Sequence, residues 1–286
     1  MGDTCEEWAL CDLGAQALGA VTYGIYPTAS AAEVLYQMRD GGASLFVAEN
    51  QEYVDKILSH ADALPGLRWI VVIDDSAMFA YQDARLRTFA ELLELGGEAG
   101  LDDLERYGRA IDPASGAFIV YTSGTSGVPK GVLHGQRAVW GRRLMYRGWY
   151  GIEPDDVVLH TGAFNWTYTL GTGLFDPWAN GAIALLYCGP RDITVWPRLA
   201  RAHGATIIAS VPSLYRQLLK YGATDGFESL RHGLSAGEVL SPALYHEMIA
   251  RTGLTLYEAL GMSEISTYVS SSPHAPPKPG SPGKPQ

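Results

Sequence analysis

The chain has 286 residues, of which 47% are hydrophobic and 18% charged, so it can bury one large core or two smaller ones and is not disordered over most of its length. Its 21 Lys and Arg residues against 31 Asp and Glu residues give a formal net charge of -10. A chain this acidic is not expected to bind nucleic acid without sequence preference or to lie on a membrane through basic residues, so any anionic ligand needs a local site.

The first third of the chain alternates between strand and helix patterns. Apolar residues at helical spacing predict a helix at residues 5–18, and β-branched and aromatic residues predict a strand at 21–26. Thr28 or Ser30 can cap the next helix, which runs to residue 40. The further predicted elements are a strand at 44–48, a helix at 52–60 and a buried strand at 69–73.

The same alternation continues through the rest of the chain. Predicted strands lie at 118–121, 157–160, 182–187, 206–210 and 254–257, and predicted helices at 138–150, 195–203, 213–221 and 242–251. This alternation indicates the α/β class, with parallel sheets and helices on both faces. An acidic stretch at 96–115 suggests a first α/β subdomain at 1–100 and a second at 101–272, before a Pro/Gly-rich tail at 273–286.

Cysteine usage and hydropathy indicate the compartment. Cys5, Cys11 and Cys188 lie far apart and form no Cys-x-x-Cys pair, so neither a zinc site nor a redox disulfide is expected. No apolar run approaches the roughly 18 residues of a membrane-spanning helix, so stable membrane insertion is not expected. The first residues contain neither a basic region nor a hydrophobic stretch, and we therefore predict a cytoplasmic protein.

The most informative segment runs from residue 119 to residue 131, where a buried-strand pattern leads into glycines, hydroxyl residues and one lysine. Glycines let backbone N–H groups converge on one anion and a lysine adds a point charge, so the composition is that of a phosphate-binding loop. The spacing is not that of a Walker A loop, and the alternative is a polar turn after a strand. The candidate phosphate-binding residues are Thr122, Ser123, Gly124, Thr125, Ser126, Gly127 and Lys130.

This segment resembles the phosphate-loop signature of the adenylate-forming, or AMP-binding, enzymes. That superfamily includes acyl-CoA and aryl-CoA synthetases, peptide-synthetase adenylation domains and luciferases. The match covers nearly all of residues 121–131, and two further signatures of the family follow in order at 235–239 and 257–264. Val239 is a mild departure, since a proline is common there. The resemblance implies the large N-terminal domain of the acyl-CoA synthetase-like fold.

The two downstream signatures imply where the nucleotide binds. By resemblance, Gly237 and Glu238 form the turn against the adenine. The segment that covers the adenine is Glu258, Ala259, Leu260, Gly261, Met262 and Ser263. Glu264 is the expected Mg²⁺ ligand, because Mg²⁺ keeps several waters and needs few carboxylates. The implied catalytic residues are Lys130, Ser263 and Glu264. Outside this ordered set, Ser263 with Glu264 would be interpreted as a helix cap, and Gly237 with Glu238 as a helix-start turn.

An aromatic, nearly uncharged segment falls where the family lines its acid pocket. The implied pocket residues are Phe164, Asn165, Trp166 and Gly261. Family members that activate amino acids carry an aspartate in place of Asn165, so the expected substrate is an acid without an α-amino group. Acetate-specific members carry a tryptophan at the position of Gly261. Glycine there favours a medium- or long-chain fatty acid or an aromatic acid, and core packing of the aromatic residues is the alternative.

The resemblance implies an AMP-forming ligase that joins a carboxylic acid to a thiol. The acid attacks the α-phosphorus of ATP, and CoA as co-substrate then takes the acyl group as a thioester; the implied cofactors are ATP and Mg²⁺. Because family members are longer, we expect a weakly active fragment without the N-terminal start and the C-terminal domain. The alternatives are an inactive nucleotide-binding scaffold, an ATPase without acyl transfer, and an adenylation domain without CoA ligation.

Overall fold

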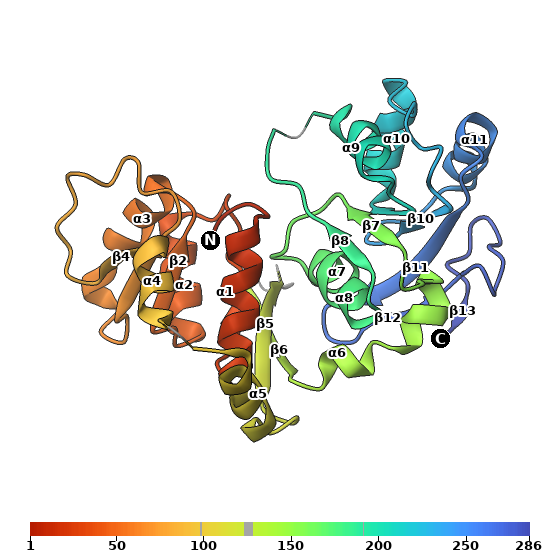
Figure 1. Ribbon diagram of the computed structural model, residues 1–286. Coiled ribbons are helices and arrows are strands. Elements are labelled where there is room, and N and C mark those ends of the chain that lie inside the picture. The colour runs from red at the N-terminus through yellow and green to blue at the C-terminus, as the bar shows by residue number, and fades with distance from the viewer. Residues whose placement is uncertain (98, 123–127, 191) are drawn as a thin grey trace. The chain divides into compact units, whose positions relative to one another are not determined.

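The computed structural model describes residues 1–97, 99–122, 128–190 and 192–286 (Figure 1). The chain divides into two compact units, Met1–Gln136 (unit 1) and Arg137–Gln286 (unit 2). The longest described helix, α1 at Glu6–Ala17, has 12 residues. No helix in the described ranges therefore combines the length and the hydrophobicity of a transmembrane segment.

Unit 1 holds two small sheets. One is parallel throughout, in the order β2-β3-β4, and the other places β1 parallel and β6 antiparallel to the central strand β5. The helices are α1, α2 (Ala31–Asp40), α3 (Gln51–Leu58), the short η1 (Ala61–Ala63), α4 (Phe89–Gly96) and α5 (Leu101–Ala110). The strands are β1 (Thr22–Tyr23), β2 (Leu45–Ala48), β3 (Trp69–Val72), β4 (Leu86–Thr88), β5 (Gly116–Thr122) and β6 (Lys130–Gly135).

The parallel sheet of unit 1 forms because apolar residues of strands and helices meet in one core. Val34 on α2, Ile57 on α3 and Ile70 on β3 are fully buried members of a single cluster. Ser30 caps α2, since its hydroxyl accepts from the Glu33 N–H while the Glu33 carboxylate accepts from the Ser30 N–H. The alternation predicted for this part of the chain is confirmed.

The acidic stretch at 96–115, which suggested a subdomain boundary, includes a helix. It contains helix α5, none of whose residues is buried, and this explains why it shows no core-facing pattern in the sequence. The compact units divide later, after Gln136, so β5 and β6 both belong to unit 1. The subdomain scheme of 1–100, 101–272 and 273–286 stays a prediction.

Unit 2 is built on one seven-stranded sheet in the order β13-β12-β11-β10-β9-β7-β8. The pairs β8–β7, β7–β9, β9–β10 and β10–β11 are parallel. At one edge of the sheet, β12 pairs antiparallel with β11 and β13 pairs antiparallel with β12. The strands are β7 (Val157–His160), β8 (Ile183–Leu185), β9 (Ile207–Ser210), β10 (His232–Ser235), β11 (Leu256–Met262), β12 (Ser266–Ser270) and β13 (Lys284–Pro285). The helices are α6 (Ala138–Gly141), α7 (Thr167–Leu170), α8 (Asp176–Ala179), α9 (Val195–His203), α10 (Pro212–Lys220) and α11 (Pro242–Thr252), with two π-helical turns, η2 (Tyr146–Tyr150) and η3 (Gly171–Phe175).

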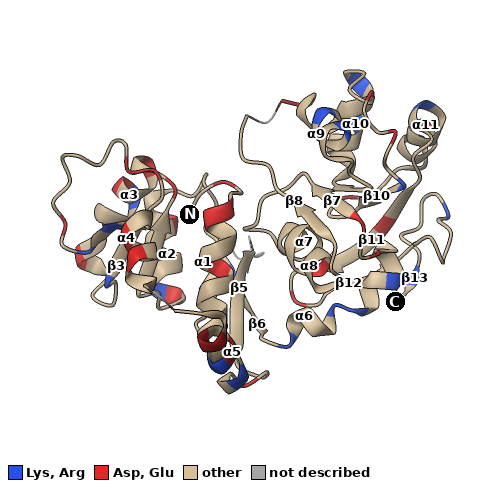
Figure 2. Cartoon of the chain, viewed as in Figure 1, with Lys and Arg blue, Asp and Glu red and all other residues tan. Residues whose placement is uncertain are grey.

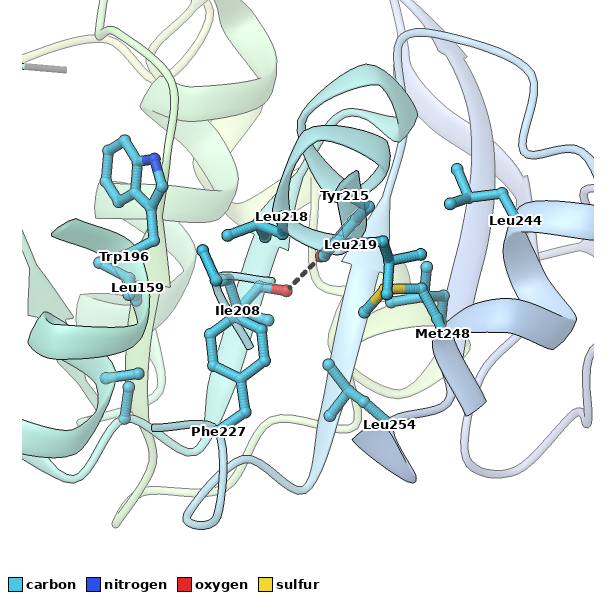
Figure 3. Close-up of a cluster of buried hydrophobic side chains, with 14 of the residues drawn as sticks. Leu159, Trp196, Ile208, Tyr215, Leu218, Leu219, Phe227, Leu244, Met248 and Leu254 are labelled. Atoms are coloured by element: carbon cyan, nitrogen blue, oxygen red, sulfur yellow. Dashed lines mark hydrogen bonds between the residues drawn. The ribbon is translucent and has the colours of Figure 1, made fainter. Parts of the chain in front are cut away.

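Apolar clusters bury both faces of this sheet. Ile208 of β9 lies in the cluster formed with α9, α10 and α11 (Figure 3), whereas its neighbours Ile207 and Ala209 lie in a second cluster with Trp149 and Tyr168. Successive residues of a strand point to opposite faces, so helical elements cover both faces of the sheet. The predicted α/β class is confirmed, with antiparallel pairing added at β6, β12 and β13.

Charged residues are rare on the strands of this sheet. Among its described strands, Glu258 on β11 and Lys284 on β13 are the two that carry a charge (Figure 2). Lys284 lies in the Pro/Gly-rich tail, where β13 pairs with β12. Glu258 lies on β11, inside the sheet, where its carboxylate accepts a hydrogen bond from the Leu240 backbone N–H.

Candidate functional site

The ends of the predicted phosphate loop lie on two paired strands of unit 1. Thr122, the last residue of β5, pairs with Lys130, the first residue of β6, and its hydroxyl donates to the Lys130 carbonyl oxygen at 3.5 Å. The two ends of the predicted loop are therefore neighbours on paired strands. The Lys130 side chain is exposed. The remaining predicted loop residues, Ser123, Gly124, Thr125, Ser126 and Gly127, lie outside the described residues.

Two tyrosines tie both sides of this loop to helix α2. Before the loop, the Tyr121 hydroxyl donates to Asp40 Oδ2 at 2.9 Å; after it, the Pro129 carbonyl oxygen accepts from the Tyr36 hydroxyl at 3.0 Å. Burial raises the pKa of Tyr121, and Asp40 raises it further, so the phenol stays a neutral donor. The sequence alone did not reveal Tyr36 or Asp40, because no local pattern links α2 to a loop that follows β5.

The predicted adenine turn after β10 packs against the aromatic segment after β7. Gly237 has a φ of 87°, and a Cβ at this position would lie 2.6 Å from Cη2 of Trp166. Glycine is therefore required both by the backbone conformation and by the close indole ring. The Glu238 carboxylate accepts from the Ser213 backbone N–H at 3.0 Å and from its hydroxyl at 2.8 Å. Glu238 thus stabilises the N-terminal end of α10.

The second predicted adenine segment lies on β11. Glu258 is buried, its Oε1 accepts from the Leu240 backbone N–H at 2.9 Å, and burial raises its pKa. This hydrogen bond ties β11 to the turn after β10, so the structure brings the two predicted adenine segments together. Of the other predicted residues on β11, Ala259 is buried, whereas Leu260, Gly261 and Met262 are exposed at the end of the strand.

Gly261 is required by the neighbouring strand. A Cβ there would lie 2.5 Å from the Ser266 carbonyl oxygen on β12, and the pairing of β11 with β12 shifts register between Leu260 and Gly261. Any side chain would displace the β12 backbone. Close strand packing therefore accounts for glycine at this position, and its role in an acid pocket stays a prediction.

The turn between β11 and β12 presents Ser263 and Glu264. Ser263 is half-buried and Glu264 is exposed. Within the described ranges, no three His, Cys, Asp or Glu side chains gather as a metal site. A single exposed carboxylate nevertheless suits Mg²⁺, which is usually bound through one or two carboxylates together with waters and substrate phosphates.

The predicted acid-pocket segment is mostly buried. Phe164 and Asn165 are 3% and 6% exposed, and Trp166 packs edge-on against Tyr168 with 5.3 Å between ring centroids. Neither amide atom of Asn165 has a hydrogen-bond partner in the part of the chain that the structure describes. Because an unpaired buried amide costs free energy, Asn165 is well suited to bind a polar group of a ligand or a water.

Other buried polar atoms lie near the carboxyl ends of β7 and β10. His160 Nε2, Ser235 Oγ and Thr169 Oγ1 have no hydrogen-bond partner among the described residues. His160 Nδ1 accepts from the Gly162 backbone N–H at 3.0 Å, and burial lowers the pKa of His160 to about 3. Ligands of parallel α/β sheets bind beyond the carboxyl ends of the strands. Ser235 begins the signature predicted at 235–239, but the sequence did not single out its hydroxyl or that of Thr169 as a ligand-binding group.

Comparison with known proteins identifies the family to which the chain belongs. The model of the AMP-binding enzyme family matches residues 1–286. A 3-hydroxybenzoate--CoA/4-hydroxybenzoate--CoA ligase of Thauera aromatica is 28% identical over 92% of this chain and 48% of its own length. The mitochondrial acyl-coenzyme A synthetase ACSM3 of Homo sapiens is 33% identical over 58% of this chain and 29% of its own length.

Solved structures show the same similarity. An anthranilate CoA ligase, AuaEII, in complex with anthranoyl-AMP has a TM-score of 0.84 and 25% identity, covering 100% of this chain and 54% of that protein. A benzoate CoA ligase from Burkholderia xenovorans LB400, with a TM-score of 0.80 and 21% identity, shares the fold over 99% of this chain and 54% of its own. The chain thus spans about half or less of the relatives it matches. It belongs to the family of AMP-binding enzymes.

Proposed function

We propose that this chain forms the nucleotide- and acid-binding part of an ATP-dependent, AMP-forming ligase that joins a carboxylic acid to CoA. The observation that carries the proposal is family membership over the whole chain, together with relatives that are CoA ligases and acyl-coenzyme A synthetases. Two structural features support it. In unit 1 the two ends of the loop of residues 122–130 are neighbours on paired strands, and in unit 2 the turn after β10 contacts both β11 and Trp166.

The proposed nucleotide contacts follow the predicted roles. The hydroxyl and backbone donors of residues 122–127, with Lys130, bind the β- and γ-phosphates. The adenine lies between the turn at Gly237 and the exposed end of β11. Glu264 holds Mg²⁺, since its single exposed carboxylate fits an ion that shares its coordination with phosphates and waters. When bound, Mg²⁺ offsets negative charge on the phosphate oxygens.

The proposed reaction has two steps. An oxygen of the substrate carboxylate attacks the α-phosphorus of ATP, so a carbon–oxygen–phosphorus anhydride forms while the bond to pyrophosphate breaks. The CoA sulfur then attacks the acyl carbon, forming the thioester and releasing AMP. The contribution of this chain is to position the reactants and to stabilise charge with Lys130 and the donors of the loop.

An aromatic acid with a polar ring substituent is the substrate class we favour. Relatives act on hydroxybenzoates or hold anthranoyl-AMP, and the segment at 164–166 combines aromatic side chains with a buried amide. The unpaired amide of Asn165 offers both a donor and an acceptor to a ring hydroxyl or amino group. Fatty acids of medium or long chain remain the second candidate, since acyl-coenzyme A synthetases are also among the relatives.

Exchange of labelled pyrophosphate into ATP tests this function. The acids to compare are benzoate, 3-hydroxybenzoate, anthranilate, octanoate and phenylalanine, each with the 286-residue chain and Mg²⁺. We expect exchange only with an added acid, highest with a substituted benzoate and absent with phenylalanine. Asn165→Leu, of similar volume, should shift the preference toward unsubstituted benzoate.

The rival functions give different results in the same assay. An ATPase without acyl transfer would release phosphate from ATP when no acid is present. An inactive nucleotide-binding scaffold would bind Mg-ATP but exchange no pyrophosphate with any acid. An adenylation domain without CoA ligation would exchange pyrophosphate but form no thioester when CoA is added. Each outcome contradicts a stated part of the proposed reaction.

A further inference from the structure

The turn that carries Glu264 ends in a strained residue. Ser266, the first residue of β12, has a φ of 60° and is the one non-glycine residue with a positive φ in the described part of the chain. A left-handed conformation is unfavourable for a residue with a Cβ. Ser266 pairs with Met262 across the hairpin. Its conformation therefore sets the path of the three residues between them, Glu264 included.

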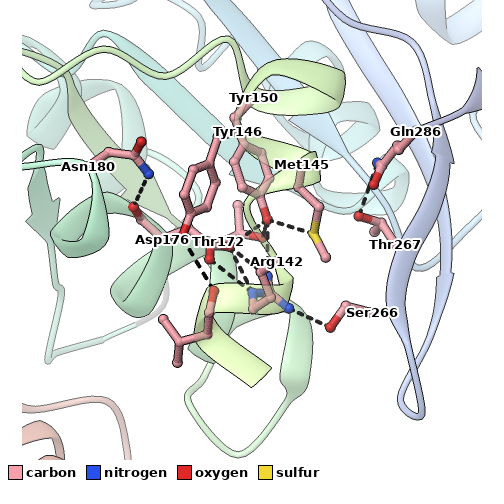
Figure 4. A network of polar contacts seen from close by, with 11 residues as sticks. Arg142, Met145, Tyr146, Tyr150, Thr172, Asp176, Asn180, Ser266, Thr267 and Gln286 are labelled. Atoms are coloured by element: carbon pink, nitrogen blue, oxygen red, sulfur yellow. Dashed lines mark hydrogen bonds and ion pairs between the residues drawn. The ribbon is translucent and has the colours of Figure 1, made fainter. Parts of the chain in front are cut away.

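A buried arginine holds this strained residue. Arg142 follows α6, and its Nη1 donates to Ser266 Oγ at 2.5 Å (Figure 4). The Arg142 side chain is 8% exposed. A Cβ on Gly171 would lie 2.1 Å from Arg142 Nη2, so the guanidinium has no free space on that side. The donor to Ser266 is thus fixed by packing as well as by charge.

The guanidinium is fixed in turn by a fully buried carboxylate. Arg142 Nε donates to both oxygens of Asp176 at 3.0 Å, and Arg142 Nη2 donates to Asp176 Oδ2 at 2.7 Å. The Tyr150 hydroxyl donates to Asp176 Oδ2 at 2.7 Å and contacts Thr172 Oγ1 at 3.0 Å. Tyr150 ends the π-helical turn η2 and Thr172 lies in η3; π-helical turns are frequent at functional sites. Breaking such a buried pair leaves an uncompensated charge, so the network cannot rearrange easily.

We infer that Arg142 and Ser266 are positioning residues that hold the turn between β11 and β12 so that Glu264 is presented in one place. This inference rests on the proposed role of Glu264 as the Mg²⁺ ligand. Arg142 does not touch the nucleotide in this scheme. It acts through Ser266, which lies two residues from Glu264. The hydrogen bond from Arg142 to the Ser266 hydroxyl holds that residue in its strained backbone conformation.

The test measures how ATP affinity depends on Mg²⁺ in the 286-residue chain. Calorimetric titrations with ATP are made at a series of Mg²⁺ concentrations and in EDTA. Ser266→Ala removes the acceptor of the Arg142 hydrogen bond, and we expect it to raise the half-saturating Mg²⁺ concentration roughly tenfold, the size of a hydrogen bond to a charged group. ATP affinity in EDTA should not change, because the loop at 122–130 is untouched.

Three further variants separate positioning from general destabilisation. Ser266→Asn keeps an acceptor and tolerates a positive φ, so it should restore the Mg²⁺ dependence. Ser266→Gly removes the backbone strain and the acceptor together, so it should match Ser266→Ala in Mg²⁺ dependence while unfolding at a higher temperature. Thr267→Ala is the matched control: it removes a neighbouring hydroxyl that accepts a hydrogen bond from Gln286 instead of Arg142, and it should bind as the unmodified chain does.

The outcomes distinguish this inference from the function on which it rests. Mg²⁺-dependent binding that Ser266→Ala leaves unchanged would overturn the inference alone. Equal losses with Mg²⁺ and in EDTA would also overturn it, since they would indicate a structural role. If the unmodified chain binds no ATP in the presence of Mg²⁺, the proposed function fails, and the inference fails with it.

Discussion

The two elements proposed to hold the phosphates and the metal are supported in different ways. The loop after β5 is tied to α2 by neutral tyrosine hydroxyls, each worth about 0.5–1.5 kcal/mol. The turn after β11 is held by a buried ion pair, whose partners are costly to separate. The difference teaches that the described ends of the proposed phosphate loop are held by neutral hydrogen bonds, whereas the turn that carries Glu264 is held by charge. A turn that offers one carboxylate depends on the side chains behind it.

The largest expected effect comes from breaking the support of the β11–β12 turn. Asp176→Asn leaves the buried Arg142 charge without its counterion, and we expect a loss of about 3–5 kcal/mol in the free energy of unfolding. Tyr121→Phe removes the corresponding tie of the phosphate loop but leaves the Asp40 carboxylate exposed to water and the Gln37 carbonyl oxygen still accepting from Tyr23, so about 0.5–1.5 kcal/mol is expected. Urea denaturation of both variants measures the two losses.

The comparison fails if the two variants are equally destabilised. As a control, Glu247→Ala removes an exposed ion pair with Arg251, and such i,i+4 pairs contribute only about 0.3–0.5 kcal/mol. If Asp176→Asn lowers the free energy of unfolding no more than Glu247→Ala does, the Arg142 network does not stabilise the fold.

The next effect concerns the contact between the adenine turn and the aromatic segment. Gly237 and Gly253 both have a positive φ, but a Cβ on Gly253 meets nothing within 4 Å, whereas one on Gly237 meets Trp166. Gly253→Ala should therefore cost only the conformational penalty of roughly 1–2 kcal/mol. Gly237→Ala should cost roughly 1–3 kcal/mol more, because of the steric overlap. Thermal unfolding of the pair measures the difference, and equal melting temperatures would show that Trp166 yields freely.

The last effect is a pH dependence of stability that has opposite signs in the two units below about pH 6. Burial lowers the pKa of His160 to about 3 and of His232 to about 4. The unfolded state therefore takes up protons first, and unit 2 loses stability as the pH falls below about 6.5. In unit 1, burial lowers the pKa of the Met1 amino group to about 6, which removes stability as the pH falls from about 8 to 6, and raises the pKa of Asp12 to about 6, so the folded state gains stability between about pH 6 and 4.

Amide hydrogen exchange at pH 6 and pH 5, below the window of the Met1 amino group, measures the stability of the two units separately. After correction for the intrinsic exchange rate, the core helix α10 should open more readily at pH 5 and α2 less readily. The slope is at most about 1.4 kcal/mol per pH unit for each group. Asp12→Asn should abolish the response of unit 1 alone. Parallel changes in both units would contradict the assignment of these groups.

Where the apolar pattern decides an element, the sequence was sufficient. The predicted strand at 157–160 and helix at 195–203 coincide with β7 and α9. Strand β10 was missed although all its residues are buried, because its four residues include a histidine, a glycine and a serine and its partners come from elsewhere in the chain. The helix predicted at 138–150 is interrupted after α6, at Arg142, whose buried contact with Asp176 no local pattern could indicate.

The site was predictable as segments but not as a structure. Ordered motifs identified the loop at 121–131 and the segments at 235–239 and 257–264, because each is continuous in the chain. The supports are not continuous: Arg142, Asp176 and Ser266 meet only in the folded unit. Likewise, the resemblance predicted that Gly261 leaves the acid pocket open. In the structure, the close approach of the β12 backbone is by itself a sufficient reason for glycine at this position.

Calorimetry with Mg-ATP tests the central claim most directly, namely that the loop at 122–130 and Glu264 serve one nucleotide. The account predicts one binding site on the 286-residue chain. Lys130→Ala should weaken binding roughly 10- to 100-fold, the value of a hydrogen bond to a charged group, and Glu264→Gln should weaken it only when Mg²⁺ is present. No heat of binding with the unmodified chain, or binding that both variants leave unchanged, would contradict the claim.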